Sequence, residues 1–107
     1  MKYRVIASRR ADADARQITR WIAQRSLQGA QAWLDAYEAL LERLAEYADS
    51  CPAALEDAEC SIRLRESLFR TRHGRTYRAV FTIAGDEVRI LRIRGPGQPP
   101  LQDDELV

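Results

Sequence analysis

The stretch Thr76-Tyr77-Arg78-Ala79-Val80-Phe81-Thr82-Ile83 decides the fold, because its side chains are arranged as in a half-buried β-strand. One face would carry Tyr77, Ala79, Phe81 and Ile83, and the opposite face Arg78, Val80 and Thr82. Turn sequences lie on both sides, His73-Gly74 before the strand and Ala84-Gly85-Asp86 after it. The stretch is therefore predicted to be the middle strand of a three-stranded meander.

The two flanking strands follow from the same kind of pattern. Residues 88–94 form the last strand, and Ile62 and Leu64 alternate with Arg63 and Arg65 in the first one. The alternation breaks near Glu66-Ser67, which predicts a bulge or a short interruption there.

Positive charge concentrates in this meander. Residues 61–94 contain nine arginines and three acidic residues, a net charge of +6, whereas the sixty residues before them sum to −2 and the tail to −3. Of the 17 basic residues only Lys2 is a lysine, and arginine binds phosphates and carboxylates through a planar fork of donors. Codon bias could cause the arginine-to-lysine ratio, but it does not explain the clustering. The meander is thus a candidate surface for nucleic acid or an acidic peptide.

Two helices are predicted before the meander. Ser8 is placed as the N-cap of a helix over residues 10–25, and Ser26 as the cap of a longer helix over residues 28–49 that ends at Cys51-Pro52. The short connection predicts an antiparallel helical hairpin. Trp21, Trp33 and Tyr37 lie on the apolar stripes and are expected in the core; the alternative is that Trp21 or Trp33 is partly exposed and covered by a partner.

With a first strand over residues 2–8, the element order is β-α-α-β-β-β. This order predicts an α+β two-layer sandwich, in which the hairpin packs on one face of a small antiparallel sheet. The uncovered face would carry the alternating arginines. Residues 1–94 would form this domain, and residues 95–107 a Pro/Gly spacer with an acidic tail that is expected to be mobile, or alternatively to fold back on the arginine face.

Several classes of protein and site are disfavoured. No stretch approaches the roughly 20 apolar residues of a membrane span, and the N-terminus lacks a signal-peptide pattern, so a cytoplasmic protein is expected. With a single histidine, and with Cys51 and Cys60 in no metal-binding spacing, neither a metal nor another cofactor is predicted. The two cysteines are expected to be free thiols, with a disulfide between them as the alternative.

The sequence resembles the RelE/ParE toxins of bacterial type II toxin–antitoxin modules over roughly residues 3–101. The resemblance is carried by Tyr3-Arg4-Val5 with Ser8-X-X-Ala11, the helix from Ala30 to Leu44, Leu64-Arg65-Glu66, Tyr77-Arg78-Ala79-Val80-Phe81, and Val88-X-Ile90-Leu91-X-Ile93. It implies a growth-arresting toxin, bound in a complex by a cognate antitoxin whose C-terminal part wraps around it. The target would be DNA gyrase, as for ParE-like members, or mRNA in the ribosome, as for RelE-like endoribonucleases.

The resemblance also supplies candidate site residues. Arg78 matches the arginine that contacts the scissile phosphate in RelE-type enzymes, and Arg63 and Arg65 fall where those enzymes place further basic residues. The sequence departs from the nuclease pattern after the last strand, because no His, Tyr, Lys or Arg follows Arg94. The single histidine, His73, lies in a turn, and Tyr77 is expected to face the core.

This departure favours a gyrase-directed or divergent toxin, with an mRNA endoribonuclease as the alternative. Whether the protein is an enzyme stays open on these residues. A third hypothesis is a non-catalytic module whose basic face binds nucleic acid or an acidic peptide. Binding to nucleic acid would weaken steeply with salt.

Overall fold

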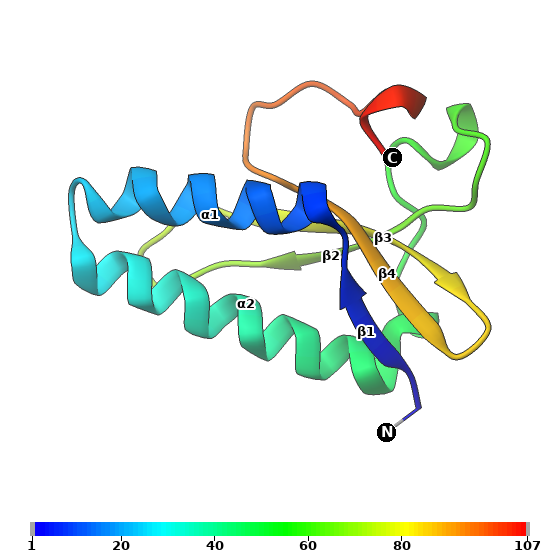
Figure 1. The fold of residues 1–107 in the computed structure, drawn as a ribbon, viewed down its shortest axis with the longest axis horizontal. Coiled ribbons are helices and arrows are strands. Elements are labelled where there is room, and N and C mark those ends of the chain that lie inside the picture. The colour runs from blue at the N-terminus through cyan, green and yellow to red at the C-terminus, as the bar shows by residue number, and fades with distance from the viewer. Residues whose placement is uncertain (1, 107) are drawn as a thin grey trace.

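The computed structural model describes residues 2–106 as two helices packed on one face of a four-stranded sheet (Figure 1). The strands are β1 (Arg4–Ala7), β2 (Arg65–Phe69), β3 (Tyr77–Ala84) and β4 (Glu87–Arg94), and the long helices are α1 (Arg9–Ala23) and α2 (Leu27–Tyr47). Short 3-10 turns follow at η1 (Ala48–Ser50), η2 (Asp57–Glu59) and η3 (Asp103–Glu105). The predicted α+β fold and its element order are confirmed.

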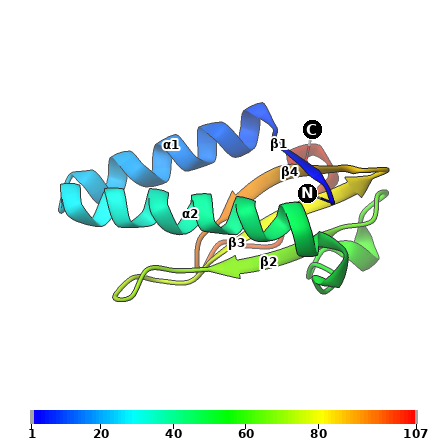
Figure 2. The same cartoon turned by 90° about the horizontal axis from the view of Figure 1, so that it is seen from below.

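Both helices begin at the predicted serine caps. The Ser8 side chain accepts a hydrogen bond from the Ala11 N–H at 3.1 Å, and the Ser26 side chain accepts one from the Gly29 N–H at 2.8 Å. Each cap satisfies a backbone donor that has no partner within its own helix. The two helices then lie side by side as an antiparallel hairpin, as Figure 2 shows.

The sheet is mixed rather than antiparallel throughout. Its strand order is β1-β4-β3-β2; the β2–β3 and β3–β4 pairs are antiparallel, but β1 pairs with β4 in parallel. The helical hairpin explains why β1 and β4 are parallel. The C-terminal end of α2 lies beside the start of β1, where the backbone N–H groups of Lys2 and Tyr3 donate to Ala45 O. The chain therefore starts β2 at the end where β1 started. Two reversals later, β4 again runs in the direction of β1.

The predicted position of β2 lies too early in the sequence, and the bulge predicted near Glu66-Ser67 is wrong. Residues 61–64 lie outside the sheet, and β2 pairs regularly with β3 from Arg65 to Phe69. The irregularity lies between β3 and β4, at Val80 and Phe81. Leu64 is buried against the segment around Ala54 and the tail. The alternation of Ile62 and Leu64 with arginines therefore comes from a loop and not from a strand.

The main core lies between the helices and the sheet. Trp33 and Tyr37 from α2 form one aromatic cluster with Phe69 and Tyr77 from the sheet, in which neighbouring ring centroids lie 5.4 to 6.0 Å apart. Aromatic clusters of this kind bury a large apolar area in few residues. None of the helices within residues 2–106 is long and apolar enough to cross a membrane.

The opposite face of the sheet is not open, contrary to expectation. A second cluster of buried side chains forms there from Ala54, Leu64, Val80, Leu101 and Leu106. The linker after α2 and the C-terminal tail thus cover the outer face of β3, and the tail folds back rather than hanging free, as the neighbouring green and red segments of Figure 1 illustrate.

Candidate functional site

Arg78 lies on the outer face of β3, as predicted, but its guanidinium is enclosed. It donates to Glu56 Oε1 at 2.8 Å and to Glu66 Oε1 at 3.3 Å, and only 16% of its side chain is exposed. Hydrogen bonding to Glu56 raises the pKa of Arg78, which stays charged. In this state the guanidinium is neutralised by carboxylates and is not free to bind a phosphate.

Glu56 holds together three parts of the molecule. Its Oε2 accepts a hydrogen bond from the Leu101 N–H at 2.9 Å, so the linker, β3 and the tail meet at one buried carboxylate. Burial by itself raises the pKa of Glu56, but the hydrogen bonds from Arg78 and Leu101 outweigh this effect and hold the pKa at about 2. The carboxylate is therefore ionised at every physiological pH.

Arg65 and Arg63 do not join Arg78. Arg65 pairs across the strands with Phe81, which places it on the helix-facing side of the sheet, where it donates to Cys51 O at 2.6 Å. Arg63 is outside the sheet, 94% exposed, and 3.5 Å from Asp57. Arg63 and Arg65 line one small hollow of about 140 Å³ that Arg78 does not reach. The three candidate residues therefore do not form a single phosphate-binding site.

Two further arginines of β4 are also occupied. Arg92 donates to both carboxylate oxygens of Asp14 on α1, at 2.8 and 3.0 Å. Arg94 is buried and donates to Pro99 O in the tail, while its Nε has no hydrogen-bond partner within residues 2–106. Burial and the neighbouring Arg92 lower the pKa of Arg94. These side chains bind the helix and the tail to the sheet.

Groups for proton transfer are not gathered around Arg78. His73 lies in the loop between β2 and β3, and Tyr77 points to the core side of β3. Within residues 2–106 there is no cluster of His, Cys, Asp and Glu side chains that could hold a metal ion. Cys51 and Cys60 both carry free thiols, and burial raises the pKa of each.

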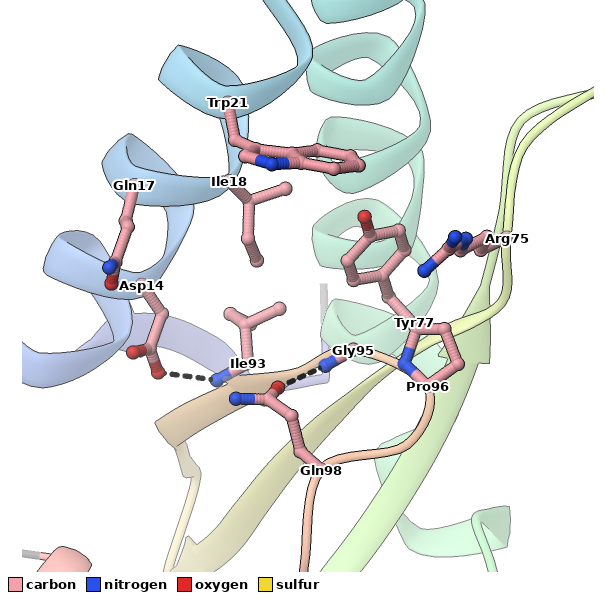
Figure 3. Close-up of a pocket in the computed structure, with 10 residues that line it drawn as sticks. All are labelled: Asp14, Gln17, Ile18, Trp21, Arg75, Tyr77, Ile93, Gly95, Pro96 and Gln98. Atoms are coloured by element: carbon pink, nitrogen blue, oxygen red, sulfur yellow. Dashed lines mark hydrogen bonds between the residues drawn. The ribbon is translucent and has the colours of Figure 1, made fainter.

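A groove lies on another part of the surface, between α1 and the end of the sheet (Figure 3). It has a volume of about 370 Å³ and an apolar floor made by Ile18, Trp21, Tyr77 and Ile93. Its polar lining includes Asp14, Gln17, Arg75 and Gln98. Asp14 accepts a hydrogen bond from the Ile93 N–H at 2.9 Å, which fixes α1 against β4 along the groove. We call this surface the Trp21 groove.

Trp21 is the exposed member of the tryptophan pair. It is 46% exposed, whereas Trp33 is 1% exposed and belongs to the core. The Arg25 guanidinium lies 4.1 Å from the centre of the Trp21 ring, a cation–π contact. Another hollow of about 270 Å³ shares Trp21, Arg75 and Tyr77 with the groove and extends it toward the β2–β3 loop. We call it the second hollow. The expectation that Trp21 lies in the core is therefore wrong, and the alternative of a partly exposed side chain is correct, because the sheet ends before covering it.

Comparison with known proteins agrees with the fold. The family model of the ParE toxin of type II toxin–antitoxin systems (parDE) matches residues 5–98. No curated protein sequence matches the chain significantly. A solved structure described as the chromosomal ParDE TA system from P. aeruginosa contains a similar chain, with a TM-score of 0.65 and 19% sequence identity over 88% of this chain and 96% of that one.

The two comparisons carry different weight. At 19% identity, the structural similarity establishes the fold alone. The family model extends over nearly the whole sequence, from β1 to the tail, and so covers the helices, the sheet and the Trp21 groove. The predicted membership is confirmed: the chain belongs to the ParE toxin family of type II toxin–antitoxin systems.

Proposed function

We propose that the protein arrests growth by acting on DNA gyrase in the cytoplasm, and that a cognate antitoxin neutralises it by binding over the Trp21 groove. Membership of the ParE family supports the role of toxin. The observation that carries the choice of target is the enclosed Arg78, whose guanidinium is bound by Glu56 and Glu66.

Cleavage of mRNA by a RelE-like mechanism would need different surroundings for Arg78. The attack of a 2′-OH on its own phosphate requires cations that stabilise the developing charge and side chains that move protons. Here two carboxylates already bind Arg78, and His73 lies beside Trp21 in the second hollow instead of beside Arg78. These positions favour a toxin that acts by binding over one that cleaves RNA.

The Trp21 groove has the chemistry of a protein-binding surface. An apolar groove that contains the exposed Trp21 next to polar groups suits the apolar side of an amphipathic helix, whose polar side would contact Arg75, Gln17 and Gln98. Burying the exposed part of Trp21 would contribute strongly, because large aromatic side chains dominate the energy of protein interfaces. Binding of an antitoxin would cover the apolar side chains of this surface and give its polar groups partners.

Induced expression tests the proposal in cells. Expression without the antitoxin should stop growth, and co-expression of the antitoxin should restore it. Damage from a gyrase poison should switch on an SOS reporter and give filamentous cells before protein synthesis falls. Immediate loss of protein synthesis without an SOS signal would point to mRNA, and normal growth at confirmed soluble expression would contradict the role of toxin.

A further inference from the structure

One end of the molecule carries only positive charge. It is formed by the turn between α1 and α2 and by the loop between β2 and β3, which lie at the same end in Figure 2. Residues 17–34 and 67–85 contain no Asp or Glu. We call this end the basic pole and define it by its exposed arginines Arg20, Arg25, Arg70, Arg72 and Arg75.

Two separate elements meet at this pole. The second hollow is lined by Trp21 and Gly29 from the helices and by Thr71, His73 and Arg75 from the β2–β3 loop. The loop therefore lies against the end of the helical hairpin. The pole arginines therefore come from two segments that lie together at one end of the molecule.

In the part of the chain that the structure describes, no carboxylate pairs with an arginine of the basic pole. The ion pairs found within residues 2–106 involve Lys2, Arg4, Arg63, Arg78, Arg89 and Arg92. None of the five pole arginines is among them. Most of the meander's other arginines are held by carboxylates or backbone carbonyls, so the free positive charge of the meander lies at Arg70, Arg72 and Arg75 rather than on the face of its sheet.

We propose that the basic pole binds the phosphate backbone of duplex DNA. Guanidinium groups bind phosphate oxygens through paired hydrogen bonds, and the two segments that form the pole contain no carboxylates that would repel a polyanion. The choice of DNA as the source of phosphates rests on the proposed function, because gyrase works on duplex DNA. In that setting the pole would hold the toxin on the DNA segment next to its target.

Arg75 belongs to both the Trp21 groove and the basic pole, and the exposed Trp21 ring lies beside it at their border. A protein seated in the groove would therefore cover part of the pole. For that reason, the test uses arginines that do not line the groove, Arg70 and Arg72, so that DNA binding is separated from antitoxin binding.

The experiment measures binding of the purified full-length protein to a short fluorescent DNA duplex by anisotropy, between about 50 and 200 mM salt. The wild-type protein should bind at low salt, and the logarithm of its affinity should fall against the logarithm of salt with a slope of about −2.7 to −4.5, as expected for three to five phosphate contacts. The double variant Arg70→Ala/Arg72→Ala should bind at least ~10-fold more weakly and with a slope smaller by about 2.

A matched control removes the same charge at the other end. Arg4 and Arg89 both bind Glu87 beside the β3–β4 turn. The variant Arg4→Ala/Arg89→Ala should bind DNA with a slope close to that of the wild type. Undetectable binding by the wild type at low salt, equal losses in both double variants, or tighter binding to an RNA duplex of the same sequence would each overturn the proposal.

The result is independent of the gyrase assay. DNA binding is measured with the toxin and DNA alone, so inhibition of gyrase without DNA binding would remove this proposal and leave the proposed function intact. DNA binding by the wild type that depends on Arg70 and Arg72, without any effect on gyrase, would support the pole and contradict the proposed target.

Discussion

At the scale of single residues, the ion pair between Arg78 and Glu56 organises the outer face of the sheet. Two buried charges are costly to remove from water, and they are tolerated here because Glu56 also accepts the Leu101 N–H and Arg78 also reaches Glu66. Substituting Arg78 would leave the buried Glu56 carboxylate without its cation, and substituting Glu56 would leave Arg78 paired with Glu66 alone. Toxicity and folding of an Arg78 variant should therefore be measured together, because loss of the fold would also abolish toxicity.

The low pKa of Glu56 predicts a pH dependence of stability. Its ordinary value is 4.5 and its value in the folded protein is about 2. The folded state thus favours the ionised form, so the contribution is fully present above about pH 4.5 and is lost as the pH falls toward 2. A shift of this size corresponds to roughly 3 kcal/mol.

Urea unfolding of Glu56→Gln against the wild type measures this contribution. The variant should be less stable by about 2 to 3 kcal/mol at neutral pH. The difference should shrink as both proteins are taken from pH 4.5 toward pH 2, because Glu56 is then protonated. Glu59→Gln, at an exposed position three residues away, is the control and should change stability by less than ~0.5 kcal/mol. A difference that does not change with pH would contradict the ion-pair account.

Trp21 carries the prediction for the groove. Its side chain is half exposed in the free protein and becomes available for burial when a partner binds. Trp21→Ala should weaken binding of the antitoxin by about 2 kcal/mol or more, a factor of roughly 30, measured by calorimetry. The stability of the Trp21→Ala variant itself should change little, because the contacts that it loses are partly exposed to solvent.

Leu27, which is 80% exposed in the first turn of α2 and does not line the groove, provides the control for Trp21. Leu27→Ala should leave antitoxin affinity within a factor of about two. Equal affinities for the wild type and Trp21→Ala, with both proteins folded, would place the antitoxin on a different surface.

At the scale of elements, the C-terminal tail acts as a third layer over the sheet. Leu101 is 3% exposed and packs with Leu106 against Val80, and Arg92 and Arg94 donate to the backbone oxygens of Glu105 and Pro99. The tail therefore contributes to the stability of the domain. The expectation of a mobile tail rested on its Pro/Gly spacer and its charge, which give no information about where its two leucines pack.

Leu101→Ala tests whether the tail is part of the folded unit. Removing this buried side chain should lower the free energy of unfolding by about 2 to 4 kcal/mol. Leu55→Ala, at an exposed position in the linker, should cost less than ~0.5 kcal/mol. The Leu101 amide should also be protected in hydrogen exchange, because it donates to Glu56. A neutral Leu101→Ala variant with a rapidly exchanging amide would show that the tail is detached in solution.

The elements that could be predicted from the sequence are those with strong local signals. The serine caps, the apolar stripes of both helices and the alternation of β3 each depend on nearby residues, and each was correct. The direction of β1 relative to β4 and the position of β2 depend on contacts between distant parts of the chain. The enclosure of Arg78 could not be predicted either, because Glu56 and Leu101 come from segments without any periodic pattern.

At the scale of the whole molecule, charge is sorted along its length. The basic pole lies at one end, while acidic residues gather in α2 after Leu34, in the linker, at the β3–β4 turn and in the tail. The arginines of the sheet had suggested one basic face, but most of them bind carboxylates or backbone oxygens within the chain. Attraction by a polyanion would therefore orient the molecule so that the turn of its helical hairpin and the β2–β3 loop face the polyanion.

The most direct test of the central claim uses purified gyrase, ATP and relaxed plasmid DNA. The protein should block supercoiling and accumulate cleaved plasmid, and prior addition of the antitoxin should prevent both effects. The same preparation should leave mRNA intact in a reconstituted translation reaction. Full supercoiling at an excess of folded protein, together with cleaved mRNA on ribosomes, would contradict the account.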